Sequence, residues 1–181
     1  MSDSIKLHLG SGGRNIHGFI NVDARADTNP DVVCDINEIN TKFKDEKVEL
    51  IYACHVMEHF KDPDKFLRRC FALLQPGGTL RLSVPDMKAV FKHYHLHGDL
   101  NVLKHFIWGG GKYHLDWHYD GWDLSTLTKD LWSIGFRSVR TYKWQDTEHY
   151  YVDDYSQAYL PHLDKVNGVL MSLNVEATKP E

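Results

Sequence analysis

The sequence predicts an α/β protein built on a mostly parallel sheet, and three observations lead to that fold class. Short apolar runs that are typical of buried strands recur along the chain, at residues 5–9, 19–22 and 48–54. Helices with capping signals alternate with such runs, beginning near Asp62 and Asp123. A glycine-rich turn, residues 10–13, follows the first run directly. Strands that alternate with helices form parallel sheets.

In the first third of the chain, strands dominate over helices. The predicted strands cover residues 5–9, 19–23, 31–36 and 48–54. The third of these is apolar enough to be buried. Between the first two strands there is room for a single helical turn at most, so this crossover is predicted to lack a proper helix.

The remaining two thirds alternate more regularly. A helix begins after Asp62-Pro63 and stops at Pro76-Gly77-Gly78, because an Asx cap before proline is a favourable helix start. A second helix begins after Asp123 and ends at Gly135. The other predicted elements are a strand at 79–84, helical structure over 87–107, and strands at 136–142 and 169–177. We expect the last strand to return antiparallel at the edge of the sheet.

Length and charge bound the function. The chain has 181 residues, and we expect residues 1–181 to form one domain. Its formal charge of −4 and its lack of a basic run disfavour nucleic acid as a partner. We expect no membrane span and, because Met1–Ser4 has no signal-peptide features and the three cysteines show no metal spacing, a cytoplasmic location.

The glycine turn and the carboxylate after the second strand predict a nucleoside cofactor. Gly10 and Gly12 let backbone approach a ligand closely, and Asp23 follows the next strand, where it would reach ribose hydroxyls. A dinucleotide site needs a third glycine at position 15, which is Asn15, and a longer spacer. NAD is therefore disfavoured.

Several motifs together resemble class I S-adenosylmethionine-dependent methyltransferases. They are Gly10-Ser11-Gly12, Asn21-Val22-Asp23, Asp35-Ile36, Cys54-His55 with Glu58-His59, and Leu74-Gln75-Pro76-Gly77-Gly78. The Leu-x-Pro-Gly-Gly turn is the most specific of them. The chain looks closest to small, single-domain methyltransferases associated with polysaccharide and cell-surface sugar biosynthesis.

This resemblance implies a Rossmann-like, seven-stranded sheet with an antiparallel last strand, S-adenosylmethionine as cofactor and S-adenosylhomocysteine as product. The glycine turn would hold the methionine end, Asp23 the ribose, and Asp35 with Ile36 the adenine. The residues implied to bind the cofactor are Gly10, Ser11, Gly12, Asp23, Ala24, Asp35, Ile36, Cys54, His55 and His59.

We expect the acceptor pocket in two later segments, about residues 86–122 and 145–168. His118 is the predicted general base, with Asp116 orienting it, since a hydroxyl acceptor gains from a base within hydrogen-bond reach. Trp108, Trp117, Tyr119 and Trp122 would form a wall that stacks on a sugar, if they are not core. The predicted substrate-binding residues are Asp86, Trp108, His114, Tyr155 and Gln157. Asp86 would serve equally well as a helix cap.

The resemblance implies that the acceptor is a sugar hydroxyl on a nucleotide sugar, glycan or glycolipid precursor. N-methylation of an amino sugar or small amine is the alternative within enzymes. A catalytically inactive module that binds S-adenosylmethionine and serves a partner enzyme is the alternative outside them.

The residues 55–59 also spell His-x-x-Glu-His, the inverted zinc-protease motif. On a helix its two histidines would share a face and could hold zinc. That interpretation needs a third ligand and leaves Gly10 to Asp35 unexplained, so the sequence predicts no metal site.

Overall fold

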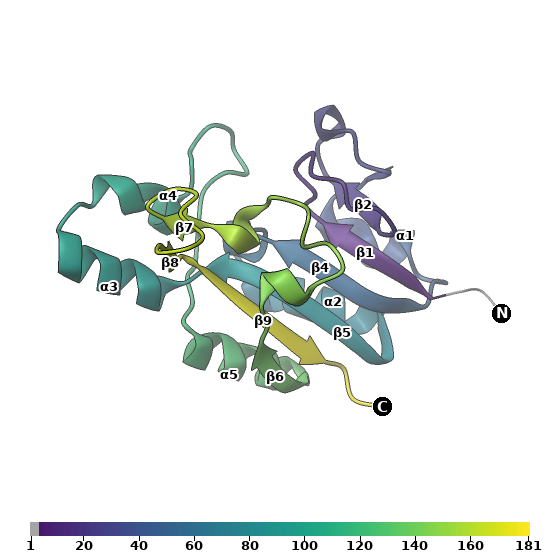
Figure 1. The fold of residues 1–181 in the computed structure, drawn as a ribbon. Coiled ribbons are helices and arrows are strands. Elements are labelled where there is room, and N and C mark those ends of the chain that lie inside the picture. Colours follow the sequence, from purple (N-terminus) through teal and green to yellow (C-terminus); the bar gives the residue numbers. More distant parts are fainter. Residues whose placement is uncertain (1–3) are drawn as a thin grey trace.

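The protein is a twisted sheet with helices packed on one of its faces (Figure 1). The computed structural model describes residues 4–181, so residues 1–3, where no signal peptide is expected, lie outside the described part. The seven strands of the sheet run in the order β3-β2-β1-β4-β5-β9-β6. Their bounds are β1 Ile5–Leu9, β2 Ile20–Asp23, β3 Val32–Val33, β4 Val48–Cys54, β5 Leu74–Pro85, β6 Arg137–Thr141 and β9 Ser172–Thr178.

Strands β3 to β5 are parallel, and β9 is antiparallel to both of its neighbours, β5 and β6. The predicted mostly parallel seven-stranded sheet is confirmed. The sequence suggested that the last strand lies at the edge of the sheet, and this prediction was wrong. Strand β9 inserts between β5 and β6, and β6 is the edge strand. The third strand is also shorter than predicted, and Val33 is 55% exposed, because β3 is the opposite edge.

Helices cover one face of the sheet. They are α1 Ile39–Lys42, α2 Pro63–Leu73 and α5 Leu124–Ile134. In α2 the Asp62 carboxylate accepts the Lys65 amide, and α5 begins with a capping box between Asp123 and Thr126. Phe66, Leu67 and Cys70 of α2 and Leu127 and Leu131 of α5 pack with alternate residues of the central strands in the largest core cluster.

The opposite face has irregular segments where helices would be expected. Leu50, Tyr52 and Cys54 of β4 point to this face and pack with Ile16 and Phe19, which belong to the β1–β2 connection. As predicted, that connection contains no helix. The segment of residues 144–157, called the strap below, also covers this face and contributes Val152 to the same cluster.

The region after β5 forms a separate layer at one end of the sheet. The predicted helical stretch splits at Gly98, whose φ of +68° ends α3 Met87–His97, and α4 Lys104–Trp108 follows. Strands β7 Tyr159–Leu160 and β8 Val169–Leu170 form a small hairpin that packs on α3 and α4 through Leu160. Figure 1 shows α3, α4 and this hairpin at the end of the sheet opposite the C-terminus. No helix in residues 4–181 is long and apolar enough to cross a bilayer.

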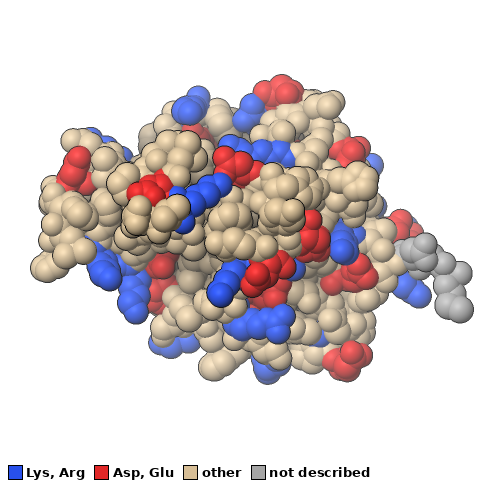
Figure 2. Space-filling view, viewed as in Figure 1, with Lys and Arg blue, Asp and Glu red and all other residues tan. Residues whose placement is uncertain are grey.

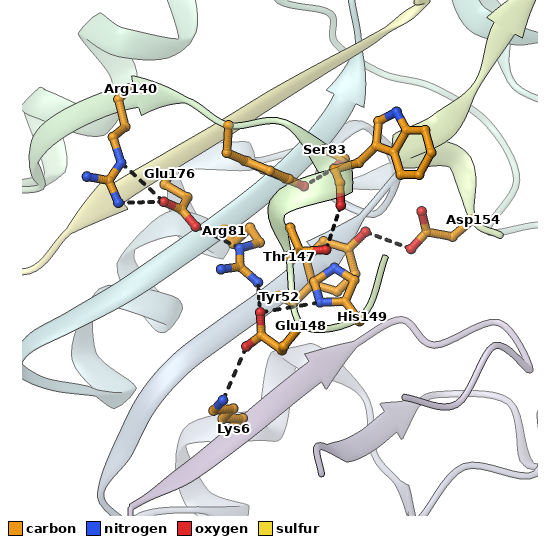
Figure 3. A network of polar contacts seen from close by, with 12 residues as sticks. Lys6, Tyr52, Arg81, Ser83, Arg140, Thr147, Glu148, His149, Asp154 and Glu176 are labelled. Carbon is orange, nitrogen blue, oxygen red and sulfur yellow. Dashed lines mark hydrogen bonds and ion pairs between the residues drawn. The ribbon is translucent and has the colours of Figure 1, made fainter. Parts of the chain in front are cut away.

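A polar network fixes the strap to the sheet (Figure 3). Arg81 of β5 donates to Glu148 at 2.7 Å and to Glu176 of β9 at 2.8 Å, and Lys6 of β1 donates to Glu148 at 3.2 Å. Tyr52 donates its hydroxyl to Asp154 at 2.7 Å. Strands β1, β4 and β5 thereby hold the strap at Glu148 and Asp154.

Candidate functional site

A cavity of about 1010 Å³ opens where the carboxyl ends of β1, β2 and β4 meet. The chain leaves β1 toward one side of the sheet and β4 toward the other, and such a switch point is where open α/β sheets bind ligands. Every residue predicted to bind the cofactor lines this cavity: Gly10, Ser11, Gly12, Asp23, Ala24, Asp35, Ile36, Cys54, His55 and His59.

The glycine turn is tied to its conformation by close packing. Gly10 has a φ of +66°, and a Cβ there would lie 2.5 Å from Cγ2 of Val56. Only glycine meets both conditions without strain. Ser11, the next residue, is buried, and its hydroxyl has no hydrogen-bond partner in the protein. The turn therefore presents a polar atom to the cavity that a ligand can satisfy.

Asp23 is held in place before any ligand binds. Its Oδ2 accepts the Gly12 amide at 2.7 Å, and its Oδ1 accepts the Arg25 amide at 2.8 Å. Each carboxylate oxygen keeps a further lone pair. The carboxylate thus links the glycine turn to the end of β2 and is still available to hydroxyl groups in the cavity.

Asp35 and Ile36, the pair expected to bind adenine, follow β3 closely in the chain. Asp35 caps a short 3-10 helix by accepting the Asn37 amide at 2.7 Å, which leaves its second oxygen free. Ile36 is buried beside it. An acceptor oxygen next to an apolar side chain suits a flat, nitrogen-bearing ring.

The segment after β4 brings together the ionisable side chains of His55, Glu58 and His59. His55 has a φ of +53°, and its Nε2 lies 3.2 Å from the Ser172 hydroxyl. Burial, with His118 nearby, lowers the His55 pKa to about 3, so this ring is neutral. Glu58 is fully buried, and neither of its oxygens has a hydrogen bond. Burial raises its pKa to about 8. Helical structure here is limited to the 3-10 turn Met57–His59, so the two histidines do not share a helix face and the zinc-protease arrangement does not form.

His118 reaches the same cavity from the loop that follows α4. Its Nδ1 is 3.0 Å from the Phe106 carbonyl oxygen, and its ring meets the His59 ring edge-on at a centroid distance of 4.8 Å. Burial first, and His59 second, lower the His118 pKa to about 4. The ring is therefore neutral and a weak proton acceptor.

Asp116 lines the cavity but does not orient His118 as predicted. Its Oδ2 accepts the Lys112 amide at 3.0 Å and so closes the loop between them. The Phe106 carbonyl positions the His118 ring instead. The local spacing of an Asp and a His two residues apart gave no sign of this, because the partner comes from α4.

Of the predicted substrate-binding residues, Tyr155 lines the cavity, and Asp86, Trp108, His114 and Gln157 are not among the lining residues. Asp86 caps α3 by accepting the Lys88 and Ala89 amides. Gln157 is buried and braces the strap by donating to the Tyr150 and Val152 carbonyls. The proposed aromatic wall does not exist either, since Trp122 is core and donates to Asp130.

The structure adds lining residues that the sequence did not single out. Many of them are cationic or aromatic: Arg14, Lys61, Lys65, Lys104, His105, Phe106, Lys112 and Tyr113. The strap adds Asp154. The predicted helical structure over 87–107 was the one available signal, and it did not show which side chains meet the cavity.

Comparisons with known proteins agree with this architecture. Residues 17–82 match the family described as methyltransferase domain. No curated protein matches the chain significantly. Among solved structures, an S-adenosylmethionine-dependent methyltransferase of Archaeoglobus fulgidus is 14% identical, with 97% of this chain and 86% of that chain covered and a TM-score of 0.60. One from Thermotoga maritima is 12% identical, with 99% and 84% covered and a TM-score of 0.58.

A third similar structure contains the cofactor. Haemonchus contortus phosphoethanolamine N-methyltransferase 2, in complex with S-adenosyl-L-methionine, is 17% identical, with 100% of this chain and 50% of that chain covered and a TM-score of 0.51. These matches support S-adenosylmethionine as the cofactor. The chain has the class I S-adenosylmethionine-dependent methyltransferase fold.

Proposed function

We propose that the protein transfers a methyl group from S-adenosylmethionine to a sugar hydroxyl of an anionic precursor such as a nucleotide sugar. The observation that carries the proposal is one continuous cavity. Its sheet side holds every residue expected to bind the cofactor, and its opposite side holds His118 and a set of lysines. The restriction to a sugar comes from the resemblance in sequence, and the restriction to an anion comes from the cavity mouth.

The cofactor would lie along the strand ends. In this proposal the glycine turn and the Ser11 hydroxyl bind the methionine end, Asp23 accepts from the ribose hydroxyls, and Asp35 accepts from the adenine amine. The sulfonium then lies near His55 and Cys54, at the end of β4.

The acceptor would enter from the side of α4. Lys61, Lys65, Lys104 and Lys112 line the mouth, and none of them takes part in an ion pair within residues 4–181. Figure 2 shows Lys and Arg spread among acidic side chains on the face of the molecule in view. The lysines that line the cavity attract an anionic ligand such as a phosphate or diphosphate. Tyr113 and Tyr155 line the same cavity and offer apolar ring faces to a sugar.

Methyl transfer is an in-line displacement that depends on placing donor and acceptor. The acceptor oxygen forms a bond to the methyl carbon as the carbon–sulfur bond breaks, and the sulfonium becomes a neutral thioether. The hydroxyl proton must leave, and His118 is the neutral group at the site that would assist its departure.

Calorimetry with S-adenosylmethionine and S-adenosylhomocysteine tests the cofactor site. We expect Asp23→Asn to weaken binding by about 10- to 100-fold, because a charged acceptor of ribose hydroxyls is lost. Asp45→Asn, at an exposed position outside the cavity, is the matched control and leaves binding unchanged. Failure of the wild-type protein to bind either compound would refute the proposal.

A product assay then separates the candidate functions. S-adenosylhomocysteine released with nucleotide sugars, and lost in His118→Ala but not in the exposed loop variant His114→Ala, supports O-methylation. Turnover with amino sugars or small amines alone would indicate N-methylation. Cofactor binding without turnover on either set would indicate a binding module.

A further inference from the structure

We infer that Glu58, His59 and His118 form a binding site for a divalent first-row transition-metal ion such as Zn²⁺ or Mn²⁺ beside the acceptor. One ligand atom from each of the three side chains lies within 4.8 Å of the others. The residues come from two separate segments, the turn after β4 and the loop after α4. Two imidazoles and one carboxylate are donors that such ions accept readily.

The carboxylate of Glu58 is the strongest sign of a missing partner. The side chain has no exposed surface, and both of its oxygens lack a hydrogen bond. The basic group next to it is His55, whose Nδ1 lies 3.2 Å from Oε1 without forming a hydrogen bond to it. A buried carboxylate without donors is costly unless it takes up a proton or contacts a cation. A bound metal ion supplies that cation.

The two histidines are already arranged as ligands. Nδ1 of His59 lies 3.1 Å from the Trp117 carbonyl oxygen, and Nδ1 of His118 lies 3.0 Å from that of Phe106. A ring that donates through Nδ1 keeps its Nε2 lone pair for a metal, and this outer hydrogen bond is usual at metal sites.

The backbone also joins the two segments. The Tyr119 amide donates to the Glu58 carbonyl at 2.8 Å, and the His118 amide donates to the Trp108 carbonyl at 3.2 Å. Ligand atoms around a bound ion are about 3–3.5 Å apart, since each bond is about 2.1 Å long. The three ligand atoms lie within 4.8 Å of one another, so binding would draw the side chains closer together.

The site deepens the proposed function and rests on it for its catalytic role. His59 and His118 line the cavity, so open coordination positions would face the acceptor. A metal-bound hydroxyl loses its proton more easily, and the proton would pass to water in the open cavity. The oxygen then attacks the methyl carbon as the carbon–sulfur bond breaks. In this scheme His118 assists the departure of the proton through the metal ion that it binds.

Metal binding can be measured without any methyl transfer. Tag-free protein is stripped with a chelator, loaded with Zn²⁺, Mn²⁺, Co²⁺ or Mg²⁺, passed over a desalting column and assayed for bound metal; calorimetry gives the affinity and Co²⁺ absorption reports the coordination. We expect one equivalent of a transition metal. Glu58→Gln, which keeps the side-chain volume, should weaken its binding by at least about 100-fold, and His118→Ala should do the same.

Two control variants separate this site from surface binding. His114→Ala removes an exposed histidine of the same loop, and the double variant His93→Ala/His97→Ala removes a histidine pair on α3 whose ring centroids are 4.4 Å apart. Both should bind metal like the wild type. Absence of bound metal in the wild type, or binding that survives Glu58→Gln and is lost with the α3 pair, would overturn the inference.

The same preparations are titrated with S-adenosylmethionine. Metal binding without cofactor binding would refute the proposed function and leave the metal site standing. Cofactor binding without metal binding would refute the metal site and leave the proposed function standing. His59→Gln replaces Glu58→Gln if the latter does not give the wild-type circular dichroism spectrum.

Discussion

At the residue scale, the position of Gly10 shows how one missing side chain defines the cofactor site. Its positive φ constrains the backbone conformation, and the 2.5 Å that would separate a Cβ from Val56 constrains the space. Gly18 has a φ of +83°, and a Cβ there would meet nothing within 4 Å, so it bears only the first constraint. The two glycines therefore form a matched pair.

We expect Gly10→Ala to lower the free energy of unfolding by about 2–4 kcal/mol and Gly18→Ala by about 1–2 kcal/mol, since the first adds a steric clash to the cost of positive φ. Urea unfolding measures both. In a Val56→Ala background the cost of Gly10→Ala should fall to that of Gly18→Ala. Equal costs for the two single variants would show that the contact with Val56 is unimportant.

At the element scale, the strap depends on charged anchors more than on apolar burial. Glu148 bridges β1 and β5 through Lys6 and Arg81. Partial burial opposes its ionisation, but the hydrogen bond from Arg81 leads the interactions that outweigh it, and they lower its pKa to about 2. Because the folded-state pKa lies below the unfolded one, this contribution to stability is present above about pH 4.5 and is lost as the pH falls toward 2.

Glu148→Gln should therefore make unfolding less sensitive to acid than it is in the wild type. Urea unfolding at several pH values between 6 and about 2.5 gives the comparison. Glu46→Gln, an exposed substitution outside the strap, should keep the wild-type slope. If Glu148→Gln and the wild type lose stability in parallel, the anchor does not operate in solution.

Local signals were enough to predict most individual elements. The cap at Asp62 gave the start of α2, and Asp123 with Gly135 gave both bounds of α5, because capping depends on residues within one turn. The predicted stop of α2 at Pro76-Gly77-Gly78 was wrong, because α2 ends at Leu73 and β5 begins at Leu74 and includes this turn. The place of β9 between β5 and β6 was missed, because strand order is set by contacts far apart in sequence. No local pattern distinguishes a central antiparallel strand from an edge one.

The same distinction applies to the candidate site. The residues proposed to bind the cofactor follow strand ends directly, so Asp23 and Asp35 could be assigned to the cavity from the strand prediction alone. Acceptor residues depend on how α4 and the loop after it pack, so Trp108 and His114 were assigned to a cavity that they do not line. Glu58 was seen as part of a motif, but its isolation from hydrogen-bond donors is visible only in three dimensions.

At the scale of the whole molecule, the buried thiols give a measure of packing. Cys34, Cys54 and Cys70 are free and buried, and burial raises the pKa of each. Thiolate is the reactive form. The folded protein should therefore react with a disulfide reagent only slowly near neutral pH.

In concentrated guanidinium chloride, all three thiols should react at once. The measurement is the absorbance of the released chromophore with and without denaturant. Rapid stoichiometric reaction of the native protein would contradict the packing of α2 and β4 described above. Added S-adenosylmethionine should slow any residual reaction at Cys54, which lines the cavity.

The insertion of β9 has a consequence for synthesis on the ribosome. Strand β6 emerges before β9, yet both β5 and β6 pair only with β9 on that side of the sheet. Until residues 172–178 have left the exit tunnel, β5 therefore presents an open edge of unpaired amides and carbonyls to other nascent chains. Completion of the sheet must await the emergence of residues 172–178, and a chain interrupted shortly before residue 172 would be prone to aggregate.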